Sequence, residues 1–374
     1  MIRSKKLSNR ITINPGWAIG ISIAISVSFF AGIIAAWIGE SVLGFDRSPI
    51  SDIMIAILLG MLIANTIQIR EEIKKGFKFC ATTLLRIGIM LLGIRLSLFG
   101  AGKFTLVALP FVLIAIIIGL SVVRILGKKM NLSPQLTGLI AVGTSICGAT
   151  AIVATAPLIK AKEAEVGYAI ACITIFGVVA MFAYPIIGNI IFSDSPESAG
   201  LFLGVSIHET AQVAGAGLMY QSQYNEPTAL DYATVTKLVR NLCMIAVIPL
   251  VGILYTNKNQ NESQYSQSWL SMIPWFIIGF AIMSAIRTLG DSGERAFYLF
   301  DHYQWEQIVE SIKYTAEKFL IIAMSAVGLT TLFSGMREIG IKPFMLGLFA
   351  ALIVGITGLI TILFFANPVI SFLG

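Results

Sequence analysis

Charged residues are scarce in this sequence. Asp, Glu, Lys and Arg make up 12% of its 374 residues, whereas hydrophobic residues make up 56%. A soluble domain usually has about a quarter of its residues charged, and no polar region here is long enough to fold separately. The shortage of charge therefore excludes an ordinary soluble protein. Residues 1–374 are predicted to form a single integral membrane domain.

Cysteine and histidine are scarce too. The four cysteines stand singly in apolar segments without C-x-x-C spacing, which excludes a disulfide framework and a zinc site of that type. His208 opens the string "HETAQ", which begins like the H-E-x-x-H of zinc proteases, but Gln212 stands where the second metal-binding histidine belongs. "GTSICG" lacks the second glycine of a G-x-S-x-G nucleophile turn. We therefore expect no enzymatic activity, no metal and no cofactor.

The basic residues are placed as in a membrane protein. The net charge of +6 comes from lysines and arginines that fall mostly in short loops, and such loops are cytoplasmic. The expected partner is therefore the lipid bilayer and not nucleic acid. The apolar run from Trp17 to Ile38 is too long for a signal peptide core, and no A-x-A cleavage site follows it. It is predicted to be the first spanning helix, with a cytoplasmic N-terminus and an extracytoplasmic C-terminus.

Eleven apolar segments predict an all-α polytopic fold. They lie near residues 17–38, 50–69, 79–100, 104–126, 134–159, 166–192, 199–221, 230–255, 269–287, 315–335 and 343–366. Nine are expected to be spanning helices, because backbone groups in lipid must be satisfied within the segment. The other two, 134–159 and 199–221, are dense in Gly, Ser, Thr and Ala, which lowers helix propensity and lets backbones approach closely. These two are predicted to be re-entrant or broken helices.

The chain contains an internal duplication of units 134–192 and 199–255. Ser145 in "AVGTSICG" aligns with Ser206 in "LGVSIHET", and "YAIACITIFGVVAMFAYPIIG" aligns with "YATVTKLVRNLCMIAVIPLVG". Interrupted hydrophobic segments at matching positions of two repeats indicate a transporter binding site near the middle of the membrane. The alternative is two tightly packed small-residue helices without a site.

Each small-residue segment could cross the membrane as a broken helix or return as a re-entrant hairpin. Hairpins put Lys160 and Lys162 in the cytoplasm with Lys128 and Lys129, and leave the acidic "SDSPES" outside, as the positive-inside rule favours. One spanning helix would then separate the two hairpins, so the repeats would be inverted and their tips would meet near the bilayer centre. Broken crossing helices remain the second alternative.

Ionisable residues within apolar segments mark a candidate site, because a charge at the centre of a membrane helix costs about 2.5–3.5 kcal/mol. Lys237, Arg240 and Asn241 share one helix face, and Arg86 lies well inside another helix. Glu209 is the acid in these apolar segments, so the site has a positive excess that suits an anion. Glu209 is expected to pair with Lys237 or Arg240. The alternative is that both cations snorkel to the outer surface.

The candidate residues fall into two sets. Predicted to bind the substrate are Thr144, Ser145, Gly148, Thr150, Ser206, Thr210, Gln212, Lys237, Arg240, Asn241 and Arg86. His208 and Glu209 form the predicted coupling pair, because modest shifts bring such groups into the physiological titration range.

With "GLIAVGTSICGATAIVA", "YPIIG" and "SIHETAQVAGAG" in place, the chain resembles the YeiH family of bacterial inner-membrane proteins, which are described as sulfate exporters. That family is related to transporters of the sodium/proton antiporter and bile-acid symporter type, which have inverted repeats and interrupted helices. The resemblance implies a multi-pass carrier in the bacterial inner membrane. Motif residues matched are Gly143, Ser145, Gly148, Ser206, His208, Glu209 and Gln212.

The predicted function is secondary-active transport of a small anion, such as sulfate or a sulfonate. No ATP-binding motif is present, so a proton or sodium gradient is the expected driving force, and export is the favoured direction. An anion channel that uses the same hairpin tips is the first alternative. A membrane receptor or assembly protein without transport is the second, and homo-oligomerisation is left open.

Overall fold

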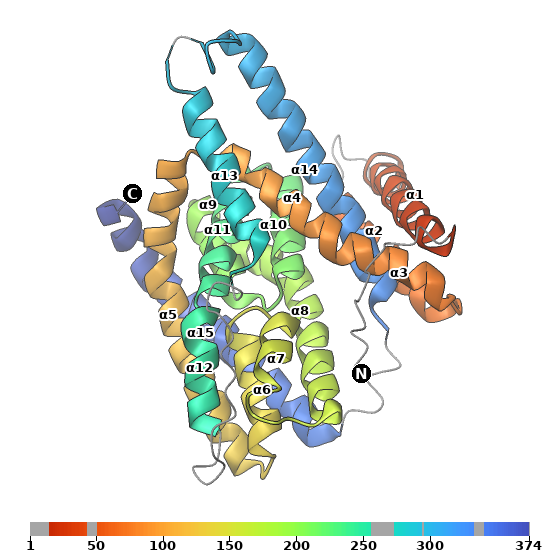
Figure 1. Cartoon of the computed structure of the whole chain (residues 1–374), viewed down its shortest axis with the longest axis vertical. Helices are drawn as coiled ribbons and strands as arrows, with labels where there is room; N and C mark the ends of the chain where they lie inside the picture. Colours follow the sequence, from red (N-terminus) through yellow and green to blue (C-terminus); the bar gives the residue numbers. More distant parts are fainter. Residues whose placement is uncertain (1–14, 43–50, 256–272, 294, 333–339, 374) are drawn as a thin grey trace, which may run out of the picture.

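The computed structural model describes residues 15–42, 51–255, 273–293, 295–332 and 340–373 (Figure 1). Within these ranges the regular structure is helical, apart from one isolated β-bridge between Ala296 and Phe300. The predicted cytoplasmic N-terminus falls on residues 1–14, outside the described residues. So do residues 269–272 and 333–335, which belong to two of the predicted segments.

Each of the eleven predicted segments contains a helix. The elements are α1 (Pro15–Trp37), η1 (Ile38–Val42), α2 (Asp52–Thr66), α3 (Glu71–Phe79), η2 (Cys80–Leu84), α4 (Leu85–Leu92), η3 (Gly93–Arg95), α5 (Leu98–Lys129), α6 (Pro134–Ser145), α7 (Ala149–Thr155), α8 (Glu163–Phe192), α9 (Pro196–Ser206), α10 (Thr210–Tyr224), α11 (Pro227–Leu242), α12 (Met244–Tyr255), α13 (Trp275–Gly290), α14 (His302–Thr330) and α15 (Ile341–Leu373). Here η1 and η2 are π-helical turns, and η3 is a 3₁₀ turn.

Six helical stretches in the described part of the chain are long and apolar enough to cross a membrane. They are Pro15–Trp37, Glu71–Arg95, Leu98–Lys129, Glu163–Phe192, Pro227–Gly252 and Ile341–Leu373. Helices α2 and α13 are apolar but shorter, and the first half of α14 carries several charged residues. The all-α, multi-pass membrane fold is therefore confirmed, while the number of nine spanning helices stays a prediction.

The first small-residue segment folds back on itself as a helical hairpin. Helices α6 and α7 are separated by a non-helical break at residues 146–148. The Ser133 hydroxyl, just before α6, donates to the Glu165 carboxylate at the start of α8 over 2.5 Å. Ala156 and Ile159, which follow α7, belong to the same buried cluster as Leu136 in the first turn of α6. The chain therefore leaves the hairpin at the end of the molecule where it entered.

The second small-residue segment returns in the same way. Helices α9 and α10 are separated by a break at residues 207–209. The Tyr220 hydroxyl near the end of α10 donates to the Asn189 side chain near the end of α8, over 3.4 Å. Because α9 begins directly after α8, both ends of this hairpin lie together. Figure 1 shows the α6–α7 hairpin in the lower part of the molecule and the α9–α10 hairpin in the upper part.

Small residues let each hairpin pack closely on a long helix. Gly119 of α5 lies against the Ser145 hydroxyl, and Gly358 of α15 lies against the Ser206 hydroxyl. A Cβ atom at either glycine would overlap the serine oxygen, so these close crossings require glycine. The aligned serines of the two repeats therefore pack against α5 and α15 instead of pointing to the helix breaks.

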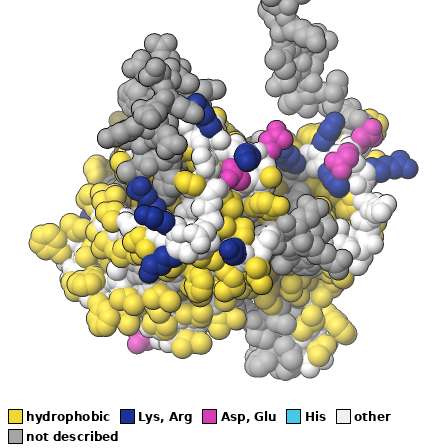
Figure 2. Space-filling view, turned by 90° about the horizontal axis from the view of Figure 1, so that it is seen from below, with side chains coloured by type: hydrophobic (Ala, Val, Ile, Leu, Met, Phe, Trp, Pro, Cys, Tyr) yellow, Lys and Arg dark blue, Asp and Glu magenta, His cyan; other side chains and the backbone are white. Residues whose placement is uncertain are grey.

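The helices form two groups. The hairpin bundle consists of α5, the two hairpins, α8, α11, α12 and α15, and the flanking bundle consists of α1 to α4, α13 and α14. Lys128, Lys129, Lys160 and Lys162 mark one end of the hairpin bundle, called the lysine-rich end, and Figure 2 shows lysines and arginines spread over this face. Asp194, between α8 and α9, marks the opposite end, called the Asp194 end.

The hairpin can be tested by labelling exposed positions with a membrane-impermeant maleimide. In a chain whose four cysteines are replaced by alanine, Lys128→Cys and Lys162→Cys are expected to react from the same side of the membrane, because the α6–α7 hairpin returns. Asp194→Cys is the control and is expected to react from the other side in oriented vesicles. Reaction of Lys128→Cys and Lys162→Cys from opposite sides would show a crossing helix instead.

Candidate functional site

Helix α11 carries two cations into the centre of the hairpin bundle. The exposed fractions of Lys237 and Arg240 are 1% and 0%. Both side chains point between the two helix breaks and not toward the surface, as their bonding partners show. The alternative that these residues snorkel to the outer surface is therefore wrong.

Lys237 binds main-chain carbonyl oxygens of both breaks. Its Nζ donates to the oxygens of Ile146 and Ile207, each over 3.0 Å, and to the oxygen of His208. Ile146 lies just after α6, and Ile207 lies just after α9. The ammonium group therefore connects the ends of two helices that come from opposite ends of the molecule.

Arg240 binds the last carbonyls of the same two helices. Its Nε donates to Ser145 O over 2.8 Å, and its Nη1 donates to Val205 O over 2.6 Å and to Ile207 O over 2.8 Å. Its Nη2 donates to the oxygen of Thr144. The guanidinium group is thus fully engaged by α6 on one side and α9 on the other.

The reason for two buried cations lies in the helix ends. The last four carbonyls of a helix have no partner within the helix, and the C-terminal end carries a partial negative charge. In a membrane interior no bulk water is present to satisfy them. Lys237 and Arg240 supply both the donors and the positive charge, so α6 and α9 can end facing each other in the protein core.

Glu209 lies at the N-terminal ends of α7 and α10, opposite to the C-terminal ends of α6 and α9 that bind Lys237 and Arg240. It precedes α10, and its carboxylate accepts a hydrogen bond from the Ala149 amide at the start of α7 over 3.3 Å. The predicted ion pair with Lys237 or Arg240 is not formed among the described residues. The physical reason is that the cations are taken by carbonyls at the C-terminal pole, whereas the carboxylate takes an amide at the N-terminal pole.

Gly148 makes room for this carboxylate. Its φ is +73°, a left-handed conformation that favours glycine, and a Cβ there would overlap the side chain of Glu209. Gly148, for which substrate binding was predicted, has a structural role in this arrangement. It turns the chain between α6 and α7 and admits Glu209 from the other hairpin.

A cavity of about 200 Å³ lies between the hairpin tips and the flanking bundle. The hairpin bundle lines it with Cys147, Ala149, Thr150, Glu209, Thr210, Ala211, Asn241 and Met244. The flanking bundle lines it with Ala81, Thr82, Leu85, Arg86, Ile89, Pro274 and Phe276. Arg86 and Glu209 therefore line the same cavity from different bundles.

Polar groups in this cavity have bonding capacity left. The Arg86 guanidinium lies 6.0 Å from the centre of the Phe276 ring and forms no ion pair with a described residue. The Asn241 amide donates to the Thr210 hydroxyl over 3.2 Å, while its buried Oδ1 has no hydrogen-bond partner in the described structure. A cation and neutral polar groups thus face the space that Glu209 also faces.

The predicted site residues divide accordingly. Five of them line the cavity: Arg86, Thr150, Glu209, Thr210 and Asn241. The others do not line it and have contacts elsewhere in the hairpin bundle: Thr144, Ser145, Gly148, Ser206, His208, Gln212, Lys237 and Arg240. For example, the Thr144 hydroxyl donates to the Ile140 oxygen in its own helix, and the Gln212 amide donates to Thr174 O over 3.3 Å.

Sequence reasoning missed Thr82, Cys147 and Phe276 in the cavity wall. Thr82 precedes Arg86 by four residues, which places both on one helix face, so this residue could have been found. No sequence signal joins Phe276 to the hairpin tips, because that contact depends on how α13 packs against α4.

Comparison with known proteins gives one consistent family. A family model described as "Conserved hypothetical protein 698" matches residues 23–347. A UPF0324 membrane protein of Bacillus anthracis is 34% identical over 348 residues, covering 92% of this chain and 94% of the relative. The UPF0324 inner membrane protein YeiH of Salmonella typhimurium is 32% identical over 348 residues, covering 91% of each chain. These relatives match nearly full length.

Replacing Arg240 by methionine is expected to destabilise the fold. Arg240→Met leaves the oxygens of Thr144, Ser145 and Val205 without this donor, and each buried unsatisfied group costs about 1–3 kcal/mol. We expect the free energy of unfolding to fall by at least about 3 kcal/mol, measured as a lower melting temperature in detergent. Lys313→Met, which removes one ion pair within α14, is the control with a loss below about 0.5 kcal/mol. Equal melting temperatures for both variants would contradict the capping role.

Proposed function

We propose that this chain, which belongs to the UPF0324 family of membrane proteins, is a secondary-active carrier of a small anion. Its motif-based resemblance to the YeiH proteins is confirmed by the same matches. Relatives are named as inner membrane proteins, and this chain has several helices suited to crossing a membrane. Transport, substrate and direction are the parts that we propose.

The observation that carries the proposal is the cavity between the two bundles. Two broken helices from opposite ends of the molecule meet at its wall, the arrangement in which transporters of inverted-repeat type bind substrate and coupling ion. We interpret units 134–192 and 199–255 as such a pair of inverted repeats. Movement of one bundle against the other would expose the cavity to each side in turn.

Arg86 is the proposed anchor for the anion. An arginine binds oxyanions through two parallel hydrogen bonds, and the Arg86 side chain is not held by a carboxylate of the described residues. The hydroxyls of Thr150 and Thr210 are neutral donors in the same wall, whereas the Thr82 hydroxyl donates to the main-chain oxygen of Lys78 over 2.6 Å. Lys237 and Arg240 serve as structural cations instead, since their donors are taken by carbonyls.

The size of the cavity favours a small substrate. Pockets for drug-sized ligands occupy about 300–1,000 Å³, whereas this cavity occupies about 200 Å³. Sulfate or a short sulfonate fits that volume and the donor set. A wall that contains an arginine, hydroxyls and an amide suits the oxygen atoms of such an anion better than it suits an apolar ligand.

Glu209 is the proposed coupling group. The carboxylate shares the cavity with Arg86, so its negative charge lowers the attraction of Arg86 for an anion. A proton or sodium ion bound at Glu209 would restore that attraction. Anion and coupling ion would then bind and cross the membrane together, so the direction of the ion gradient sets that of the anion, and an outward ion gradient would drive the proposed export.

A ligand screen with a matched arginine variant tests the anion site. We expect sulfate, sulfite or taurine to raise the melting temperature of the purified protein, and Arg86→Ala to abolish that rise. Arg287→Ala is the control, because Arg287 is bound to Asp291 and Glu306 away from the cavity. Equal loss of the ligand effect in both variants would contradict the assignment of Arg86.

Flux through proteoliposomes separates a carrier from the other two functions. A carrier accumulates labelled sulfate against its gradient when a proton or sodium gradient is imposed. A channel conducts the anion only down its gradient, and a receptor without transport binds it and gives no flux.

Glu209→Gln is expected to uncouple the carrier. The glutamine oxygen keeps an acceptor for the Ala149 amide, so the fold should persist, while the titratable charge is lost. We expect anion exchange to continue and ion-driven accumulation to fall by at least about tenfold, which corresponds to about 1.4 kcal/mol. Accumulation at the rate of the unaltered protein would exclude Glu209 as the coupling group.

A further inference from the structure

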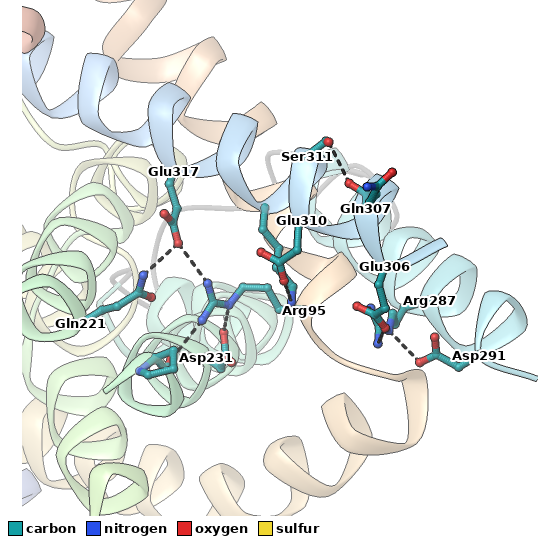
Figure 3. Close-up of polar contacts among 12 residues, drawn as sticks. Arg95, Gln221, Asp231, Arg287, Asp291, Glu306, Gln307, Glu310, Ser311 and Glu317 are labelled. Carbon is teal, nitrogen blue, oxygen red and sulfur yellow. Dashed lines mark hydrogen bonds and ion pairs between the residues drawn. The ribbon is translucent and has the colours of Figure 1, made fainter. Parts of the chain in front are cut away.

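A second polar cluster joins the two bundles away from the cavity. Arg95, in η3 at the end of α4, donates through Nε to the Asp231 carboxylate of α11 over 2.5 Å, and through Nη1 to the Glu317 carboxylate of α14 over 3.2 Å. The Gln221 amide of α10 donates to the same Glu317 oxygen over 2.8 Å. Figure 3 shows Arg95 held between Asp231 and Glu317, with Gln221 beside Glu317.

The contacts of this cluster cross from one bundle to the other. Arg95 and Glu317 belong to the flanking bundle, while Asp231 and Gln221 belong to the hairpin bundle. Three hydrogen bonds of the cluster therefore span the junction, from Arg95 Nε to Asp231, from Arg95 Nη2 to Pro227 O over 3.5 Å, and from Gln221 to Glu317. The side chains of Arg95, Asp231 and Glu317 are 8%, 16% and 30% exposed, so the junction is largely closed there.

The cluster lies on the Asp194 side of the cavity. Along α11, Asp231 precedes the cavity residue Asn241 by ten residues, which is roughly 15 Å at 1.5 Å per residue. Along α4, Arg95 follows the cavity residue Arg86 by nine residues, or roughly 13 Å. Both walls of the junction therefore continue from the cavity to this cluster.

We propose that Arg95, Asp231, Glu317 and Gln221 form a latch that closes the junction between the bundles at the Asp194 end. With the latch closed, the cavity communicates only with the lysine-rich end. With the latch open, the bundles separate at the Asp194 end and the cavity communicates with that side. This inference rests on the proposed carrier function, because a latch of this kind regulates access to the same site.

The chemistry of the cluster suits a contact that forms and breaks. An apolar seal of the same area would expose hydrophobic surface to water on opening, whereas carboxylates, an amide and a guanidinium are hydrated when they part. Burial at 8–30% exposure strengthens the closed pair relative to a fully exposed one. Removal of Arg95 leaves Asp231 and Glu317 facing each other with their charges uncompensated, which favours the open junction.

Arg287 offers a matched comparison within the same part of the molecule. It also binds two carboxylates, with 2.7 Å from Nε to Asp291 and 2.7 Å from Nη2 to Glu306. Both partners lie in or beside α13 and α14, as Figure 3 shows, so these pairs stay within the flanking bundle. Loss of Arg287 should therefore leave the junction closed.

The test measures access to the cavity from each side of the membrane. The reporter is Thr150→Cys, an exposed cavity position, in the full chain with its four native cysteines replaced by alanine. A membrane-impermeant maleimide is added to oriented vesicles, whose sidedness is set by Lys162→Cys and Asp194→Cys. We expect the reporter with an intact latch to react from the lysine-rich side.

Adding Arg95→Ala is expected to raise the rate of reaction from the Asp194 side by about tenfold, the ratio that corresponds to about 1.4 kcal/mol. Arg287→Ala is expected to leave that rate unchanged. Asp231→Asn should act like Arg95→Ala but less strongly, and Arg95→Lys should keep most of the closure. Where Arg95→Ala gives too little folded protein, Asp231→Asn carries the same comparison.

Equal rates from the Asp194 side in the Arg95, Asp231 and Arg287 variants would overturn the latch. Labelling needs neither a known substrate nor flux, so this outcome leaves the carrier proposal standing. Conversely, failure of every anion to bind or move would overturn the carrier proposal. A maleimide reaction from the Asp194 side that becomes faster on loss of Arg95 or Asp231 would still establish a closure between the bundles.

Discussion

Main-chain carbonyls exposed at two helix breaks in an apolar interior are the constraint on which this structure depends. Helices α6 and α9 end close together, and their last carbonyls would lack donors in a membrane core. Lys237 and Arg240, on a single helix, supply hydrogen bonds to both ends. The hairpins can therefore meet only because α11 brings two cations to that point. The positions of the tips, the cavity and Glu209 follow from this arrangement.

The buried positive and negative charges lie at opposite ends of the broken helices. The cations lie at the C-terminal ends of α6 and α9, and Glu209 lies at the N-terminal starts of α7 and α10. Each charge faces the helix pole of opposite sign, which stabilises both. Lys237, Arg240 and Glu209 are therefore compensated by main-chain carbonyls and amides and not by an ion pair with one another. Arg86, which lies on the other bundle, has no carboxylate partner among the described residues, as the proposed anion site requires.

Much of the fold could be predicted from the sequence because its signals are local. Apolar runs located the helices, and the alignment of Ser145 with Ser206 located both breaks. Loop lysines favoured hairpins, since Lys160 and Lys162 had to stay with Lys128. The site was harder, because the partners of Lys237 and Arg240 are carbonyls, which every residue carries and no sequence pattern marks. The contact of Arg86 with Phe276 depends on packing between helices far apart in the chain.

The crossings of Ser145 on Gly119 and of Ser206 on Gly358 have a mechanical consequence. Each hairpin is fitted to one long helix without space between them, so in the proposed carrier the tips would move with α5 and α15 as one unit. These helices have 32 and 33 residues, or roughly 48–50 Å, against about 30 Å of hydrocarbon. Their surplus length lets the unit tilt or slide through the bilayer while an apolar stretch always faces the lipid. In that carrier, the two longest helices would move together with the site.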